Sequence, residues 1–314
     1  MDIQFSPDSQ FLCVLVPQKL NFFKTADKSI AFSIDSNRMI TTFHWISPQE
    51  LAYARHRAQN VREIVIINLE SKTERVILEE RGDVRRAIWD FGGRFPLMGQ
   101  SEYWDPSGKY VLYNTDWQIH LADLSTGKVF NPSFRNVYDD EGSIGWTSDG
   151  SLVFCLLGIR GESDMIAFTI DPATNKVRDY TSQFRSSFKT EPYLMGYAGW
   201  SYDNKWLLFN DCLGVGAFLV RLDPWKVVYL NDVLTQKLST QRKPYILPIP
   251  MKGFVQVYSP GSWLVKIDDE GNLSQWSTIL TDANDPVTLS PDGNYSVFQK
   301  NNSVQIQPLE ISGR

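Results

Sequence analysis

One short motif recurs seven times along the sequence and limits the folds that this chain can adopt. Each copy has a large apolar residue, a turn of about four polar, Pro or Gly residues, and a run of strand-forming residues. Pro fixes φ near the value that a turn needs, Asp bonds to nearby backbone and Gly accepts a positive φ, so each copy predicts a tight hairpin. The copies are "FSPDSQFLCVLV" from 5, "ISPQELAYARH" from 46, "WDPSGKYVLYN" from 104, "WTSDGSLVFCL" from 146, "WSYDNKWLLFN" from 200, "IPMKGFVQVYS" from 249 and "LSPDGNYSVFQ" from 289.

A second hairpin follows in several copies, for example "IVIINLESKTERVIL" at 64–78 and "IHLADLSTGKVF" at 119–130. The unit is therefore a four-stranded antiparallel sheet, which buries both faces only by radial repetition beside its neighbours. We predict an all-β fold, a single seven-bladed β-propeller domain over 1–314 with an inserted loop at about 80–98. The blades are expected to start near residues 2, 41, 99, 142, 196, 244 and 286. The last unit stops early, so we expect a three-stranded final blade or a chain cut from a longer one.

The "SPDG"-type hairpin followed by a "DLSTGK"-type hairpin resembles the WD40-like repeats of the TolB propeller, from Phe5 to about Leu309. It also resembles the propeller domains of prolyl oligopeptidase and dipeptidyl peptidase relatives. The resemblance implies architecture rather than function, because such propellers serve as scaffolds, gates and enzymes alike. The chain has no room for the hydrolase domain of the peptidases. It also lacks the regular Gly-His and Trp-Asp pairs of typical WD40 proteins.

Composition limits the partners and the chemistry. The formal net charge of −5 argues against non-specific nucleic-acid binding, and the longest apolar run, 11–16, is too short to span a membrane. Cys13, Cys155 and Cys212 lie far apart without metal-type spacing, and we expect free thiols rather than a disulfide. The start of the sequence shows no secretory signal. This favours the cytoplasm slightly, and a periplasmic protein whose signal was removed is the alternative.

The stretch Gly199–Tyr202, "GWSY", matches the opening of the nucleophile elbow of serine hydrolases. An elbow needs a Gly two residues after the serine, and then a helix. Here Asp203 takes the place of that Gly, and a strand-like run follows. Ser201 shares the register of Ser6 and Ser290, so we interpret it as a turn residue.

We expect no catalytic site, no metal and no cofactor. His44, His56 and His120 show no cluster with other ligands, although the position of His44 in a first strand allows it to face the channel. One alternative is that four acidic turn residues form a ring that binds a cation. However, the hydrogen bonds of a turn explain each of these residues without a cation. These residues are Asp8, Asp149, Asp203 and Asp292.

Tryptophans suggest carbohydrate binding, yet Trp104, Trp146 and Trp200 share one position of the repeat. Other copies carry a different apolar residue there, which indicates packing between blades. Those residues are Phe5, Ile46, Ile249 and Leu289. Trp89 and Trp117 fit the repeat less well and remain candidates for exposed contacts.

Arginines gather in two loops that the repeat does not require. The middle loop of blade two and its link to blade three are expected at the same end of the propeller. Long loops often carry function, and arginine suits carboxylates and phosphates. The candidate binding residues are Arg57, Arg62, Arg81, Arg85, Arg86, Trp89 and Arg94. The alternative is a self-neutralising network with the acidic residues Glu79, Glu80, Asp83 and Asp90.

We therefore predict a non-enzymatic binding or scaffold propeller, a monomer or part of a larger assembly, whose partner is a protein with an acidic surface. One alternative is an accessory propeller of a larger hydrolase or multidomain protein. A carbohydrate-active propeller enzyme is the other, and it rests only on the fold and the aromatic content.

Overall fold

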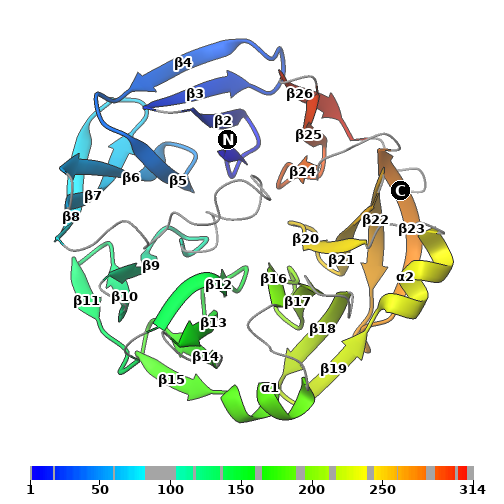
Figure 1. Ribbon diagram of the computed structural model, residues 1–314. Coiled ribbons are helices and arrows are strands. Elements are labelled where there is room, and N and C mark those ends of the chain that lie inside the picture. The colour runs from blue at the N-terminus through cyan, green and yellow to red at the C-terminus, as the bar shows by residue number, and fades with distance from the viewer. Residues whose placement is uncertain are drawn as a thin grey trace.

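The computed structural model describes residues 2–16, 18–58, 61–81, 104–115, 118–134, 137–159, 165–188, 195–211, 217–238, 244–259, 261–280, 287–300 and 303–309. These residues form seven antiparallel sheets, each built from consecutive strands. The sheets stand radially in a ring, with the chain running once around it (Figure 1). The predicted all-β, seven-bladed propeller is confirmed.

The first four blades use β1 to β15. Blade one holds β1 (Asp2–Phe5), β2 (Phe11–Val16), β3 (Lys19–Lys24) and β4 (Ile30–Asp35). Blade two holds β5 (Ile40–Ser47), β6 (Glu50–Ala58), β7 (Val61–Asn68) and β8 (Glu74–Arg81). Blade three holds β9 (Tyr110–Thr115), β10 (Gln118–Asp123) and β11 (Lys128–Phe130). Blade four holds β12 (Val137–Trp146), β13 (Val153–Ile159), β14 (Met165–Asp171) and β15 (Lys176–Asp179).

The last three blades use β16 to β26. Blade five holds β16 (Met195–Trp200), β17 (Leu207–Asp211), β18 (Ala217–Leu222) and β19 (Trp225–Tyr229). Blade six holds β20 (Tyr245–Pro248), β21 (Phe254–Ser259), β22 (Gly261–Ile267) and β23 (Leu273–Leu280). Blade seven holds β24 (Thr288–Leu289), β25 (Tyr295–Lys300) and β26 (Ser303–Pro308).

Two sheets have three strands in the part of the chain that the structure describes. In blade three, a single bridge between Trp104 and Val111 stands where the innermost strand of the other blades lies. In blade seven the described residues form three strands, β24, β25 and β26, and no fourth, outer strand is found among them. The predicted four-stranded blade thus holds for five of the seven sheets, and the described part of blade seven has three strands.

The recurring motif forms one turn structure, and the turn at Ser201 represents it. The backbone N–H of Ser201 donates to Trp206 O at 2.7 Å, and that of Asn204 donates to Ser201 O at 2.8 Å. Asn204 takes a φ of 60°, the left-handed conformation that ends the turn. Equivalent residues have the same conformation, which explains the Gly, Asn or Ser in the motif: Ser9, Gly108, Gly150 and Gly293.

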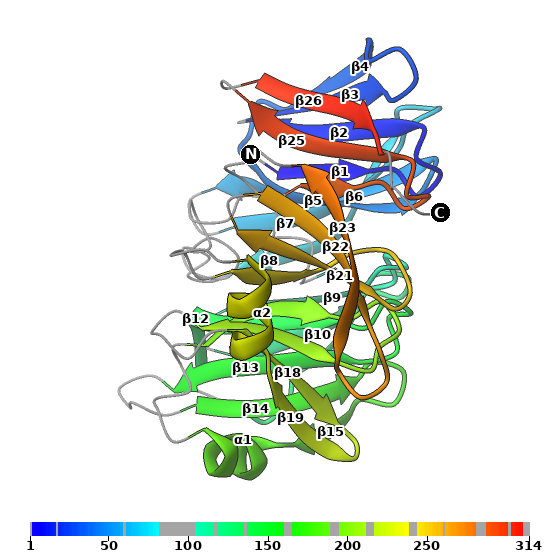
Figure 2. The ribbon, with the colours of Figure 1, turned by 90° about the vertical axis from the view of Figure 1, so that its right-hand side faces the viewer.

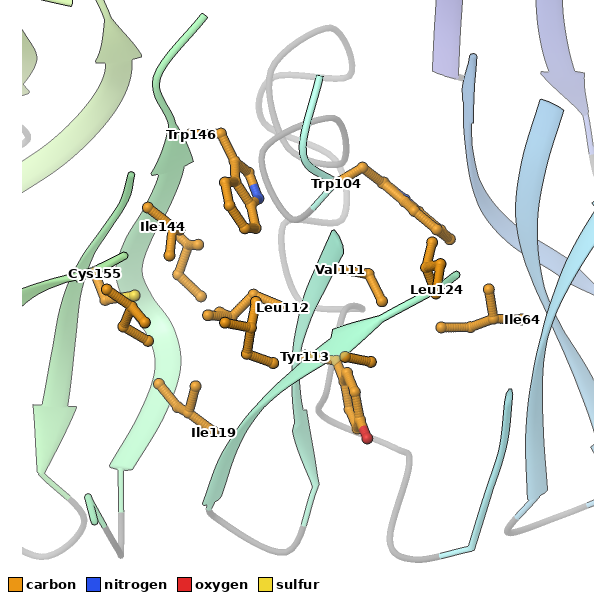
Figure 3. Close-up of a cluster of buried hydrophobic side chains, with 14 of the residues drawn as sticks. Ile64, Trp104, Val111, Leu112, Tyr113, Ile119, Leu124, Ile144, Trp146 and Cys155 are labelled. Carbon is orange, nitrogen blue, oxygen red and sulfur yellow. The ribbon is translucent and has the colours of Figure 1, made fainter. Parts of the chain in front are cut away.

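The core lies between blades, where the faces of neighbouring sheets meet. The largest cluster joins blades two, three and four and includes Trp104 and Trp146 (Figure 3). Trp104, Trp146 and Trp200 are exposed by only 1%, 7% and 8%. The indole Nε1 of Trp200 donates to Gly145 O of blade four at 3.0 Å. The prediction that these three tryptophans pack between blades is confirmed.

The predicted register is wrong by one residue in two blades. Ile46 is a β-bulge residue, because the ladder passes from Trp45–Leu51 to Ser47–Glu50. Trp45 takes the position facing blade one, where its ring meets that of Phe22 edge-on at 5.7 Å. In blade six, Pro248 rather than Ile249 pairs with Val255. Ile46 and Ile249 do pack against neighbouring blades, as predicted, but Trp45 and Pro248 occupy the position of the repeat that the sequence analysis assigned to them.

Two short helices that the sequence analysis did not predict lie in the links that follow blades four and five. α1 (Thr181–Ser187) buries Phe184, whose ring lies 5.6 Å from that of Phe154 in blade four and 5.9 Å from that of Phe209 in blade five. α2 (Asn231–Leu238) buries Leu234 in the cluster between blades five and six. Each helix closes the outer rim between two blades (Figure 1).

The ring closes through side chains between blades one and seven, which lie against one another in Figure 2. The closing cluster joins two segments from the two ends of the chain: Ile3, Phe5, Leu12 and Val14 with Val297 and Ile306. No sheet built from the described strands contains strands of both blades. In the described residues, no helix is long and apolar enough to cross a membrane.

Candidate functional site

The backbone register brings three of the candidate arginines together in blade two. His56 pairs with Arg62 across β6 and β7, so Arg57 and Arg62 lie in one hairpin end. Val61, the neighbour of Arg62, pairs with Arg81 at the end of β8. The side chains of these arginines lie outside the described part of the structure. Arg85, Arg86, Trp89 and Arg94 lie outside the described residues altogether.

The first and third turns of each blade lie at the opposite end of the propeller from this hairpin. In blade two, Leu69 N donates to Gln49 O at 2.8 Å, which ties the third turn to the first. In blade one, Thr25 N makes the same bond to Gln10 O at 3.0 Å. Arg57, Arg62 and Arg81 therefore lie at the middle-loop end, where the sequence analysis placed them.

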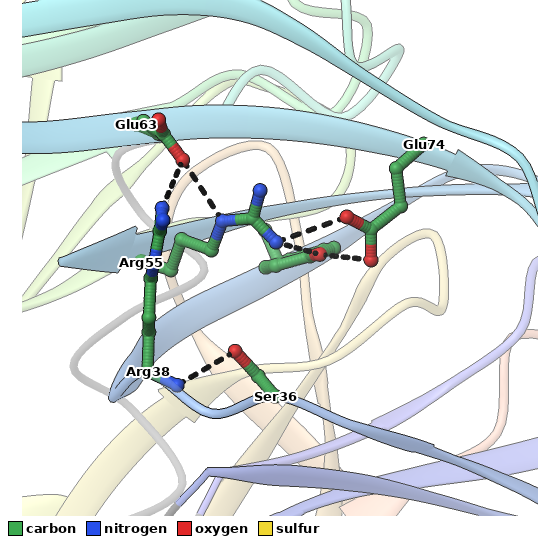
Figure 4. Close-up of polar contacts among 6 residues, drawn as sticks. Ser36, Arg38, Arg55, Glu63 and Glu74 are labelled. Atoms are coloured by element: carbon green, nitrogen blue, oxygen red, sulfur yellow. Dashed lines mark hydrogen bonds and ion pairs between the residues drawn. The ribbon is translucent and has the colours of Figure 1, made fainter. Parts of the chain in front are cut away.

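A network of charged side chains crosses the face of blade two (Figure 4). Glu63, whose side chain is 6% exposed, accepts from Arg38 Nη1 and from Arg55 Nε, both at 3.0 Å. Arg55 Nη1 also contacts Glu74 Oε2 at 2.9 Å, and Tyr53 donates its hydroxyl proton to Glu74 Oε1 at 2.6 Å. Burial, together with Glu74, raises the pKa of Tyr53, so its phenol stays protonated and donates.

This network has a structural role, because it ties the link after blade one to three strands of blade two, β6, β7 and β8. Arg38 belongs to that link, and its N–H also bonds Ser36 Oγ at 3.1 Å. The sequence analysis did not single out Arg38, Arg55 or Glu63. The sequence did carry a signal for Glu63. This acidic residue directly precedes the apolar run "IVII" at 64–67, on a strand whose other residues suit a buried core.

Ser201 has no geometry of a nucleophile in this structure. It is 1% exposed, its hydroxyl donates to Asp203 Oδ1 at 2.7 Å, and it accepts from Trp206 N at 3.0 Å. The Ser201 hydroxyl thus donates one hydrogen bond and accepts another, both within its own turn. Ser6 and Ser290 make the same pair of contacts in blades one and seven.

The histidines lie apart from one another. His44 stacks on Trp104 with ring centroids 6.3 Å apart, and its Nε2 lies 3.5 Å from Pro106 O, so it sits between blades two and three. Burial lowers the pKa of His44, more than the nearby Pro106 and Asp105 oxygens raise it. His120 Nδ1 lies 2.6 Å from Asn131 Oδ1. No group of three or more potential metal ligands is found among the described residues.

The acidic turn residues bind their own turns. Asp292 Oδ1 accepts from Ser290 Oγ at 2.6 Å and from Asn294 N at 3.0 Å. Burial alone would raise the pKa of Asp292, but these hydrogen bonds outweigh it and the pKa falls below its ordinary value. The predicted turn role therefore explains these carboxylates without a cation. Cys13 and Cys155 are buried and are not joined in a disulfide, and Cys212 lies outside the described residues.

Comparison with known proteins identifies the fold of this chain but does not assign it to a family. No protein-family model matches this sequence, and no curated protein matches it. Hydrazine synthase of Kuenenia stuttgartiensis aligns with a TM-score of 0.62 at 13% identity, over 99% of this chain and 96% of that chain. A chain of the mitotic checkpoint complex aligns with a TM-score of 0.58 at 10% identity, over 98% of this chain and 86% of that chain. TolB from Acinetobacter baumannii reaches a TM-score of 0.45 at 16% identity, over 86% of this chain and 61% of that chain.

The two likenesses with a TM-score above 0.5 show the class of fold, a β-propeller. Fold does not imply function, and the identities are too low to carry an activity across. The TolB-type family therefore remains a hypothesis that rests on the repeated hairpin motifs.

Proposed function

We propose that this protein is a non-enzymatic binding propeller that docks a partner with an acidic surface at the middle-loop end of blade two. The observation that carries the proposal is the backbone register, which gathers Arg57, Arg62 and Arg81 at that end. Guanidinium groups bind carboxylates through two parallel hydrogen bonds, so a cluster of them suits an acidic protein segment. A rigid ring of packed blades is a suitable support for such loops.

The rival explanation is that these arginines neutralise acidic residues of the same protein. The network around Glu63 favours this rival, because Glu63 of blade two already pairs with two arginines of the same protein, Arg55 of its own sheet and Arg38 of the preceding link. The two explanations differ in what a charge reversal does. Loss of a docking surface leaves stability unchanged, whereas loss of an internal network lowers it.

The test is a fluorescence anisotropy titration with a labelled 15-residue peptide rich in glutamate. We expect Arg57→Glu with Arg62→Glu to weaken binding at least tenfold. The matched control is Lys72→Glu with Arg75→Glu, two exposed residues at the opposite end of the same blade. A third variant, Arg85→Glu with Arg86→Glu, tests the link to blade three. Binding should weaken as salt rises, because charges are screened over about 10 Å at 0.1 M.

Two results would contradict the proposal. Equal losses in the Arg57/Arg62 pair and in the Lys72/Arg75 pair would indicate a general effect of net charge. A lower melting temperature in the Arg57/Arg62 pair alone would support the self-neutralising network, since exposed substitutions usually change stability by within about 0.5 kcal/mol.

A further inference from the structure

We propose that the junction between blades two and three is a pH-sensitive contact, in which protonation of His44 loosens the packing of β5 against the first turn of blade three. His44 lies in β5, the innermost strand of blade two. Its ring stacks on Trp104 of blade three with an interplanar angle of 5°. The proposal concerns a contact inside the ring of blades and does not depend on the function proposed above.

Residues of β5 on both sides of His44 also contact blade three. On one side, the indole Nε1 of Trp104 donates to Thr42 Oγ1 at 3.4 Å. On the other, a Cβ added to Gly108 would lie 2.5 Å from Ile46 Cγ1, so the backbone of the first turn of blade three approaches β5 closely. His44 therefore lies between two direct contacts that join the blades.

The surroundings of the His44 ring suit a neutral imidazole. Its Nε2 lies 3.5 Å from Pro106 O, so a proton on Nε2 points toward that carbonyl. The residue is half-buried, yet its Nδ1 is out of contact with solvent and has no hydrogen-bond partner among the described residues. A neutral ring keeps a lone pair at Nδ1, whereas a protonated ring places an N–H there. A buried donor without an acceptor costs free energy, and the cost is larger when the group is charged.

The strands of blade two supply no charge to the face on which His44 lies. His44 pairs with Ala52 of β6, and this face of β6 and β7 consists of buried apolar residues: Ala52, Ala54, Ile64 and Ile66. Arg55 and Glu63 belong to the opposite face, as the alternation of side chains along a strand requires, and they bind one another there. Glu50 stands farther along β6, opposite Ser47.

Blade three offers little compensation for a positive charge on His44. The carboxylate of Asp105 acts on the ring, but it already accepts from the backbone N–H groups of its own turn, those of Ser107, Lys109 and Tyr110. The ring centroids of His44 and Trp104 are 6.3 Å apart, slightly beyond the range of about 6 Å in which a cation gains from an aromatic face. Burial therefore outweighs the nearby oxygens and lowers the pKa of His44.

The pH range of the effect follows from the two states of the junction. Above a pH of about 6.5, the usual pKa of histidine, the ring is neutral whether the junction is closed or open, and the closed junction has its full stability. Below that pH, an exposed ring gains a proton that the buried ring does not, so opening becomes easier as the pH falls. At pH 5.5 the protonated form of an exposed imidazole exceeds the neutral form about tenfold. The junction should therefore open up to about tenfold more often at pH 5.5 than at pH 7.5.

The test is hydrogen exchange of tryptophan indole N–H groups, measured by NMR at pH 7.5 and 5.5 and corrected for the intrinsic exchange rate. The Nε1 of Trp104 reports on this junction through its bond to Thr42. The Nε1 of Trp200 is a matched control, because it donates to Gly145 O across the boundary of blades four and five from the same position of the repeat. We expect opening at Trp104 to increase at least fivefold at pH 5.5, and opening at Trp200 to change less than twofold.

The variant His44→Phe keeps an aromatic ring beside Trp104 but cannot titrate, so the change at Trp104 should fall below twofold. A change that persists in His44→Phe would assign the effect to another group and overturn the proposal. Equal changes at Trp104 and Trp200 in the wild-type protein would also overturn it, since they would indicate loosening of the whole ring of blades. An NMR titration of His44 in the wild-type protein decides the question if His44→Phe does not fold. A pKa at or above about 6.5 in that titration would show that the closed junction accepts the charge, which contradicts the proposal.

Discussion

Replacing Ser201 by Ala tests whether this serine serves the turn or a reaction. The substitution removes the hydroxyl that donates to Asp203 and accepts from Trp206 N. A hydrogen bond to a charged group contributes about 1.5–3 kcal/mol, and a buried N–H left without a partner costs about 1–3 kcal/mol. Because the two effects share one site and do not add fully, we expect a loss of about 2–3 kcal/mol in the free energy of unfolding.

The assay is urea unfolding followed by circular dichroism, with a thermal melt as a second measure. At roughly 2 °C per kcal/mol for a large domain, the melting temperature should fall by about 5 °C. Ser6→Ala and Ser290→Ala are matched controls, because both serines are fully buried and make the same two contacts. The three variants should lose similar stability.

A fluorophosphonate probe should leave the wild-type protein unlabelled, because Ser201 is 1% exposed and its hydroxyl is hydrogen-bonded within its own turn to Asp203 and to Trp206 N. Two outcomes would refute this reasoning. The first is stoichiometric labelling that disappears in Ser201→Ala. The second is a stability loss in Ser201→Ala far below that of its two matched controls, which would mean that the turns are not equivalent.

Two further substitutions test the packing. Glu63→Gln replaces a nearly buried carboxylate that accepts hydrogen bonds from Arg38 and Arg55. It should lower the free energy of unfolding, measured by urea unfolding, by about 1–3 kcal/mol. An unchanged urea midpoint would show that the network does not contribute to stability. Gly199→Ala places a Cβ 2.7 Å from Pro248 Cγ, at a residue whose φ is 135°. It should lower the free energy of unfolding, measured by a thermal melt, by about 1–3 kcal/mol. Wild-type stability in this variant would contradict the close approach of blades five and six.

The sequence predicted the ring because its signal is local chemistry. The turn at Ser290 needs a hydroxyl, a carboxylate two residues later and a residue of positive φ, and all three are visible in "SPDG". The bulge at Ile46 could not be seen, because a bulge depends on how Trp45 packs against the neighbouring blade. Helix α1 is too short for a periodic pattern to be distinguished from a loop.

The candidate site was predictable only in part. Strand order and hairpin position are enough to bring Arg57, Arg62 and Arg81 to one end of blade two. Side-chain geometry decides which carboxylate each guanidinium contacts. No repeating pattern in the sequence indicates that geometry. The pairing of Arg55 with Glu63 could be suspected from their places on adjacent strands, whereas the contact from Arg38 in the link could not.

The seam between blades one and seven has a consequence for how the ring comes apart. Every described sheet is made of one contiguous piece of chain, so no backbone ladder ties the first blade to the last. The seam holds Ile3 and Phe5 against Val297 and Ile306, with a bond of 3.4 Å from Asp292 N to Ser9 Oγ. Opening it exposes apolar surface but breaks no strand pairing. Under a pulling force on the two ends, we expect the seam to open first and the blades to unfold afterwards, one after another, from the ends inward. During folding, seven local sheets precede a closure that joins almost the whole length of the chain.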